Sequence, residues 1–192
     1  MKKKFLAAKL PYKILRHKKI YKGRSVELAL DRVRLPNGKV IDREIIYHPG
    51  SAVMIPLLNK DTIVMIRQFR YSTASFIWEF PAGTASPGEP PLSCARRELE
   101  EETGYKARRW KKLLSFYPTP GVSTEIMHLY LAWDLQKTQA HLEEDEILET
   151  KTFRISEIGR MIRTGQIIDG KTILGFLRYR FSGGQVLSSS KC

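Results

Sequence analysis

Apolar and polar positions alternate along the first quarter of the chain. Val26 to Val33 alternates in this way, and Lys39 to Tyr47 resumes an extended pattern after the segment Pro36-Asn-Gly-Lys39. Alternation with period two is typical of half-buried strands, and an Asn-Gly pair, whose residues tolerate positive φ, favours a hairpin turn. Residues 12–48 are therefore expected to form three short strands that end before Pro49-Gly50.

The rest of the chain mixes strand and helix patterns. Short apolar runs predict core strands over residues 52–58, 62–66, 113–117 and 128–135. Helices are predicted over residues 92–103, 155–162 and 171–179. Pro90-Pro91 suits the first turn of the first helix, and Gly104 suits the position that ends it. The patterns indicate a mixed α/β protein with an N-terminal strand segment at residues 1–48 and a main domain at 49–192.

Charge is unevenly distributed over the 192 residues. Residues 1–50 hold 14 of the 33 Lys and Arg side chains but 4 of the 20 Asp and Glu side chains, which favours anionic ligands such as nucleotide phosphates or RNA. No apolar run reaches the ~18 residues of a membrane span, and Lys9 interrupts the apolar stretch near the N-terminus. Two cysteines, Cys94 and Cys192, make no disulfide framework or zinc site, so a cytoplasmic location is expected.

The sharpest chemical feature is a group of three glutamates in the first predicted helix. Glu98, Glu101 and Glu102 stand at i, i+3 and i+4, so they share one helical face and repel one another. A bound cation would relieve that repulsion, and carboxylate oxygens select Mg²⁺ or Mn²⁺. The alternative interpretation is a solvated acidic face paired with Arg96, Arg97 and Lys106.

The surrounding residues decide between these interpretations. Gly83, Glu89, Arg97 and Gly104 stand at set distances from the glutamates, and together they match every fixed position of the Nudix box over the 23 residues from Gly83 to Tyr105. The chain therefore resembles the Nudix hydrolases, which cleave nucleoside diphosphates linked to another moiety. The resemblance implies an α/β/α sandwich with a loop–helix–loop metal site.

Further segments resemble the branch that acts on ADP-ribose and other nucleoside diphosphate sugars. They are Ile66 to Tyr71, Trp78 to Gly83, Pro120 to Glu125 and the acidic segment Glu143 to Glu146. Resemblance to this branch implies an added N-terminal antiparallel β-sheet that crosses to the second subunit of a homodimer.

The same resemblance assigns roles at the metal site. Glu98 and Glu102 are expected to bind Mg²⁺, for which Mn²⁺ can substitute, with Glu101 sharing the site. The carbonyl of Ala82 adds an oxygen ligand. Arg97 is expected to orient the glutamates, and Glu89 to support the loop that begins at Gly83.

The general base is expected on the acidic segment, because a carboxylate held near an activated water suits that task. Glu144 and Glu146 are the best matches, with Glu144 slightly favoured and Glu101 next.

Substrate-binding residues are predicted in several segments. Arg70 and Arg43 are the phosphate candidates, because a guanidinium matches phosphate oxygens, while Arg67 is expected on the opposite sheet face from Gln68. Relatives place the position of Glu125 near the distal sugar, and Glu44 is a candidate for contacting the base or ribose. Relatives carry a base-stacking aromatic after the Tyr21-Lys-Gly23 segment, where this chain has Arg24, so Arg24 or Tyr21 is expected to stack.

These expectations converge on Mg²⁺-dependent hydrolysis of ADP-ribose or a related nucleoside diphosphate sugar to a nucleoside monophosphate and a sugar phosphate. The alternatives are hydrolysis of RNA 5′ ends or of GDP-mannose, and a Nudix-fold nucleotide sensor without turnover. RNA is possible but not favoured, and no membrane partner is expected. A homodimer through the N-terminal strands would let Arg43 and Glu44 reach the partner's pocket.

Overall fold

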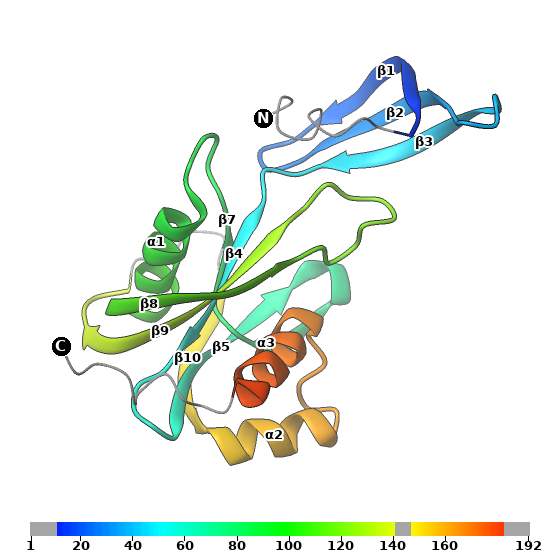
Figure 1. Ribbon diagram of the computed structural model, residues 1–192. Helices are drawn as coiled ribbons and strands as arrows, with labels where there is room; N and C mark the ends of the chain where they lie inside the picture. The colour runs from blue at the N-terminus through cyan, green and yellow to red at the C-terminus, as the bar shows by residue number, and fades with distance from the viewer. Residues whose placement is uncertain (1–10, 141–146, 183–192) are drawn as a thin grey trace.

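The computed structural model describes residues 11–140 and 147–182. Three antiparallel strands, β1 (Lys13–Lys22), β2 (Glu27–Arg34) and β3 (Val40–Tyr47), form an N-terminal sheet in the order β1-β2-β3. This sheet projects from one end of the molecule, and β3 leads directly into the main body (Figure 1). The three predicted strands and the added antiparallel sheet are therefore confirmed.

The hairpin turn between β2 and β3 differs from the expected geometry. Gly38 has a φ of +83°, whereas Asn37 does not have a positive φ. Leu35 closes the turn by accepting a 2.9 Å hydrogen bond from the N–H of Gly38 and donating a 2.8 Å bond to Lys39 O. This is a three-residue loop with Pro36 at the second turn position, for which a single left-handed residue suffices.

The main body contains two sheets. One has the order β7-β4-β9-β8, with β4 and β9 parallel and the other pairs antiparallel. Its strands are β4 (Ser51–Pro56), β7 (Ala82–Thr84), β8 (Tyr105–Phe116) and β9 (Met127–Lys137). The other sheet is antiparallel, in the order β10-β5-β6. Its strands are β5 (Thr62–Arg70), β6 (Ser75–Glu79) and β10 (Leu148–Arg154), and a 3₁₀ turn, η1 (Tyr71–Thr73), links the first two.

Helices cover both sides of this pair of sheets, α1 (Pro91–Thr103) on one side and α2 (Ile155–Arg163) and α3 (Gly170–Phe181) on the other (Figure 1). β4 is buried on both faces, which explains its uninterrupted apolar run. Val53 and Ile55 join the core with α2 and α3, while Ala52 and Met54 pack against α1. The predicted α/β/α sandwich is confirmed. Within the described ranges, no helix is both long and apolar enough to cross a membrane.

Candidate active site

Helix α1 carries the three glutamates, and its two ends are fixed by the residues that the sequence indicated. Proline occupies its first turn, and Gly104 caps the last turn in the left-handed conformation, with a φ of +66° and its N–H 2.9 Å from Glu100 O. Cys94, Ala95 and Leu99 are fully buried against β4 and β9. Burial of this apolar stripe sets the rotation of α1 and turns the glutamates toward the β7 segment.

The Ala82–Gly83 segment of β7 receives two of the glutamates. A Cβ on Gly83 would lie 1.8 Å from Glu98 Cδ, so the Glu98 carboxyl group occupies the space that glycine leaves. The N–H of Ala82 donates a 3.0 Å hydrogen bond to Glu102 Oε2, and Glu102 is only 2% exposed. Both carboxylates are thereby held beside the peptide whose carbonyl was predicted to bind metal.

Arg97 joins the glutamates to the loop before α1. Its Nη1 donates to Glu98 at 2.8 Å and to Glu101 at 2.9 Å, and its Nε and Nη2 donate to the two oxygens of Glu89 at 3.1 and 3.0 Å. These hydrogen bonds raise the pKa of Arg97 and lower the pKa of Glu89, so both groups are held in their charged forms. Glu89 also accepts the N–H of Ser86 at 2.9 Å, which fixes the loop.

The donor set on α1 suits a hard divalent cation, because it consists of carboxylates beside a backbone carbonyl. The glycine cradle for Glu98 and the buried carboxylate of Glu102 support that fit. Within residues 11–140 and 147–182, no three His, Cys, Asp or Glu side chains converge closely enough to hold a metal alone. The residues therefore fit a cation whose shell also includes water or substrate oxygens, as is usual for Mg²⁺.

Arg70 lies in a charged network that sequence reasoning did not detect. Its Nε and Nη2 donate to the two oxygens of the fully buried Glu79 at 2.8 and 2.9 Å. Lys171 of α3 contacts the same carboxylate and lies 3.1 Å from Asp169 Oδ1. Burial opposes the charge on Arg70, but Glu79, with smaller contributions from Glu102 and Asp169, raises its pKa.

The sequence indicates this network only weakly, because its members come from distant segments. One local feature could have pointed to it: Asp169 caps the start of α3 by accepting the N–H of Thr172 at 3.0 Å. The Thr172 hydroxyl in turn receives the N–H of Phe80 at 2.8 Å. These bonds tie the start of α3 to the end of β6.

Glu125 is half-buried in the loop between β8 and β9, next to the start of β4. It accepts a 2.5 Å hydrogen bond from the hydroxyl of Ser51 and lies 3.7 Å from His48 Nδ1. Backbone bonds between Ile46 and the loop, 2.8 Å to Val122 O and 3.0 Å from Thr124 N, attach the loop to the end of β3. The structure thus joins the predicted sugar-binding loop to the N-terminal sheet.

The other substrate candidates lie in the N-terminal β1–β3 region. Within one chain, the N-terminal sheet lies away from α1 (Figure 1). Arg43 and Glu44 are consecutive on β3 and therefore point to opposite sheet faces, opposite Asp31 and Leu30 on β2. Tyr21 is 63% exposed at the end of β1, and Arg24 lies in the following turn. A single chain therefore does not bring these four residues to the glutamates.

The predicted general bases, Glu144 and Glu146, lie outside the described residues, as does the rest of the segment from 141 to 146. The segment connects β9 to β10, a strand that the sequence patterns did not predict. The N–H of Phe69 on β5 donates a 3.0 Å hydrogen bond to Ile147 O, so Ile147, the first described residue before β10, lies beside β5.

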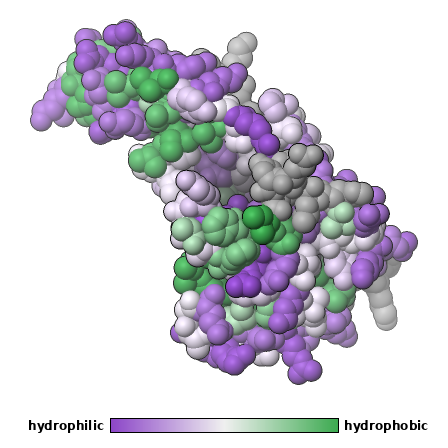
Figure 2. All heavy atoms as spheres, turned by 180° about the vertical axis from the view of Figure 1, so that it is seen from behind, coloured by the Kyte–Doolittle hydropathy of each residue, from purple (hydrophilic) through white to green (hydrophobic). Residues whose placement is uncertain are grey.

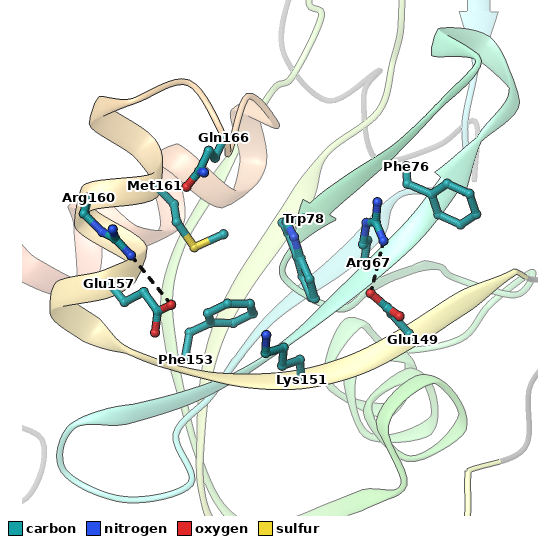
Figure 3. Close-up of a pocket in the computed structure, with 10 residues that line it drawn as sticks. All are labelled: Arg67, Phe76, Trp78, Glu149, Lys151, Phe153, Glu157, Arg160, Met161 and Gln166. Carbon is teal, nitrogen blue, oxygen red and sulfur yellow. Dashed lines mark hydrogen bonds and ion pairs between the residues drawn. The ribbon is translucent and has the colours of Figure 1, made fainter.

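A groove of about 570 Å³ lies between α2 and the β10-β5-β6 sheet, on the face of this sheet that points away from α1 (Figure 3). Arg67 and Trp78 point into it, which confirms that Arg67 faces away from Gln68. Four of its charged side chains form pairs: Arg67 lies 3.4 Å from Glu149, and Arg160 lies 3.9 Å from Glu157. A fifth, Lys151, lies over the ring of Phe153, 5.2 Å from its centre. Trp78 packs edge-on against Phe153 at 4.7 Å between ring centres, so it is a partly buried residue that packs against the core.

Comparison with known proteins places the chain in a family. The model of the NUDIX domain matches residues 48–175. The chain is 41% identical over 164 residues to the methanol dehydrogenase activator of Bacillus methanolicus, with 84% of this chain and 89% of the relative covered. It is 36% identical over 165 residues to the ADP-ribose pyrophosphatase of Bacillus subtilis (strain 168), with 85% and 89% covered. A crystal structure of an ADP compounds hydrolase shares the fold, with a TM-score of 0.80 over 92% of this chain and 97% of that chain at 20% identity. The chain belongs to the Nudix hydrolase family.

Proposed function

We propose that this protein hydrolyses the pyrophosphate bond of ADP-ribose or a related nucleoside diphosphate sugar, with Mg²⁺ as the metal ion. The observation that carries the proposal is the acidic face of α1, where Glu98 and Glu102 are held against Ala82–Gly83 and Arg97 spans Glu98 and Glu101. The 36% identity to an ADP-ribose pyrophosphatase over most of both chains supports the choice of substrate.

Nudix hydrolases generally use divalent metal ions. When bound, such an ion neutralises phosphate charge and lowers the pKa of a coordinated water. In this chain Glu98, Glu101, Glu102 and the Ala82 carbonyl are the proposed ligands. Arg97 keeps two of those carboxylates in place, because its guanidinium is itself anchored by Glu89.

Arg70 is the proposed phosphate contact within one chain. Glu79 fixes the guanidinium through two hydrogen bonds, which lowers the entropy lost when a phosphate binds. Lys171 lies between Glu79 and Asp169, so the two cations and the two carboxylates of this network balance, and the Arg70 guanidinium stays charged for contact with a phosphate. Glu144 or Glu146 is the proposed general base that removes the proton of the attacking water.

A homodimer is part of the proposal. Tyr21, Leu28 and Ile46 lie opposite one another across the three N-terminal strands, on one face, and each is exposed. Apolar side chains gather among polar ones on this sheet (Figure 2). A three-stranded sheet with an exposed apolar row needs a partner surface. The same face carries Glu44, which a dimer would deliver to the partner's pocket.

The experiment is a comparison of substrates with and without metal. Purified protein is incubated with ADP-ribose, GDP-mannose or 5′-triphosphorylated RNA in Mg²⁺, Mn²⁺ or EDTA, and products are identified by anion-exchange chromatography. The proposal expects AMP and ribose 5-phosphate from ADP-ribose, and no product in EDTA. Faster release of GMP from GDP-mannose would identify GDP-mannose as the preferred substrate, and faster release of pyrophosphate from RNA would identify RNA 5′ ends as the substrate instead. Binding of ADP-ribose without turnover of any compound would indicate a nucleotide sensor.

A further inference from the structure

Gln68 carries a buried hydrogen-bond acceptor that nothing in the described part of the chain satisfies. The residue is 7% exposed, and its Oε1 is one of two buried side-chain polar atoms in residues 11–140 and 147–182 without a hydrogen-bond partner. An unsatisfied buried polar group costs roughly 1–3 kcal/mol, so such a group in a native protein calls for an explanation.

The position of Gln68 on β5 points to the site. Side chains alternate along a strand, so Gln68 shares its face with Ile66 and Arg70, whereas Arg67 lies in the groove on the opposite face (Figure 3). Thr150, the cross-strand partner of Ile66 on β10, donates a 3.2 Å hydrogen bond to Glu102 O. Gln68 therefore stands on the sheet face that α1 covers, next to the residue that Glu79 holds in place.

We propose that Gln68 is a further residue of the active site, and that its Oε1 accepts a hydrogen bond from an O–H group of the reacting complex. This inference rests on the proposed function. Phosphate oxygens without protons cannot satisfy an acceptor, and the N–H groups of the base are separated from the pyrophosphate by the ribose, so the donor nearest the reacting bond is an O–H group. The attacking water and a ribose hydroxyl of the substrate are its two sources.

The matched pair of variants is Gln68→Met and Arg67→Met. Methionine keeps the length of glutamine but removes the polar atoms, and Arg67 is the neighbour on the opposite face of the same strand. Because Gln68→Met removes an unsatisfied buried acceptor, the thermal midpoint is expected to stay the same or to rise. Activity on ADP-ribose is expected to fall about tenfold, the effect of losing about one hydrogen bond in the transition state. Arg67→Met is expected to keep its activity within about twofold.

The two sources of the O–H group give different results. If the attacking water is the donor, kcat falls while KM stays unchanged, as does the Kd for ADP-ribose measured by calorimetry in EDTA. If a ribose hydroxyl is the donor, KM and this Kd both rise.

Two outcomes would overturn the proposal for Gln68 alone: wild-type kinetics and Kd in Gln68→Met, or a lower thermal midpoint with activity lost only in proportion to unfolding. The second would show that Oε1 is satisfied within the folded chain. A wild-type protein that hydrolyses no nucleoside diphosphate sugar would overturn the proposed function as well, so the two failures are distinct.

Discussion

Gly83 and Glu98 occupy one space in this protein: a Cβ on the glycine would lie 1.8 Å from the carboxyl carbon of the glutamate and 2.0 Å from its Oε1. Real contacts of a Cβ with other heavy atoms are far longer, so any side chain at position 83 must displace the Glu98 carboxylate. That carboxylate also receives Arg97 Nη1 at 2.8 Å, so its displacement would disturb the arginine as well.

Gly83→Ala is therefore expected to remove most activity while the chain still folds. Overpacking of this kind costs about 1–3 kcal/mol of stability, within the reserve of an ordinary domain. Gly88→Ala is a loop control, because a Cβ there meets nothing within 4 Å, although its φ of +83° brings backbone strain. Circular dichroism checks folding, and the rate of ADP-ribose hydrolysis checks the site. Wild-type turnover in Gly83→Ala would contradict the proposed role of Glu98.

Glu102→Gln is expected to lower kcat by about a hundredfold or more, a loss of about 3–4 kcal/mol of transition-state stabilisation that is typical for a key electrostatic contact. The change keeps the shape of the side chain and an acceptor for the N–H of Ala82. Glu100→Gln on the same helix is the control, since Glu100 pairs with Lys106 at 2.9 Å. Steady-state kinetics and calorimetric titration with Mg²⁺ measure the effect. Equal kcat values in the two variants would exclude Glu102 as a ligand.

The general base is tested by Glu144→Gln and Glu146→Gln. A group that acts only in the transition state should change kcat and leave KM nearly unaltered, so one of the two variants should show this pattern. The pH profile of kcat should lose its acidic limb in the same variant. If both retain full kcat, the base lies elsewhere and Glu101→Gln is the next test.

Folding stability should depend on pH through Glu89. Hydrogen bonds from Arg97 lower the pKa of Glu89 in the folded protein, so its stabilising contribution is complete above the unfolded pKa of about 4.5. It is lost as the pH falls through the lower, folded pKa. Urea unfolding from pH 3 to 7 measures it: the gap in stability between wild type and Glu89→Gln should widen as the pH rises and level off above about pH 5. A gap that is constant over this range would contradict the prediction.

Leu28→Glu tests the proposed dimer. A charge placed in the exposed apolar row with Tyr21 and Ile46 should shift the protein from dimer to monomer in sedimentation velocity and raise KM for ADP-ribose. Arg34→Glu, on the same strand and face near the other end, should leave both unchanged. A wild-type chain that sediments as a monomer at micromolar concentration and turns over ADP-ribose at full rate would contradict the dimer.

Local sequence patterns predicted those structural features that depend on residues close together in the chain, such as the ends of α1. The first turn and the cap of α1 follow from Pro90-Pro91 and Gly104, because the fixed φ of proline and the freedom of glycine act within one turn. β8 is longer than expected, since it begins at Tyr105 rather than near residue 113. Its first half carries Lys and Arg at the edge of the sheet, where charged side chains prevent further strand pairing and also hide the apolar pattern.

The sequence by itself determined the helix with its three glutamates, because periodicity, caps and the spacing of the Nudix box are local properties of the chain. The main sandwich was expected from the resemblance to the Nudix hydrolases that this box carries. Only the tertiary structure decided that the Arg70 guanidinium is held by Glu79 and that Lys171, 92 residues further along, contacts the same carboxylate. It also decided that Gln68 is buried with an unsatisfied acceptor on the site face. Ion pairs and unsatisfied polar atoms depend on which strands and helices become neighbours in space, and a single sequence does not encode those pairings in its local pattern.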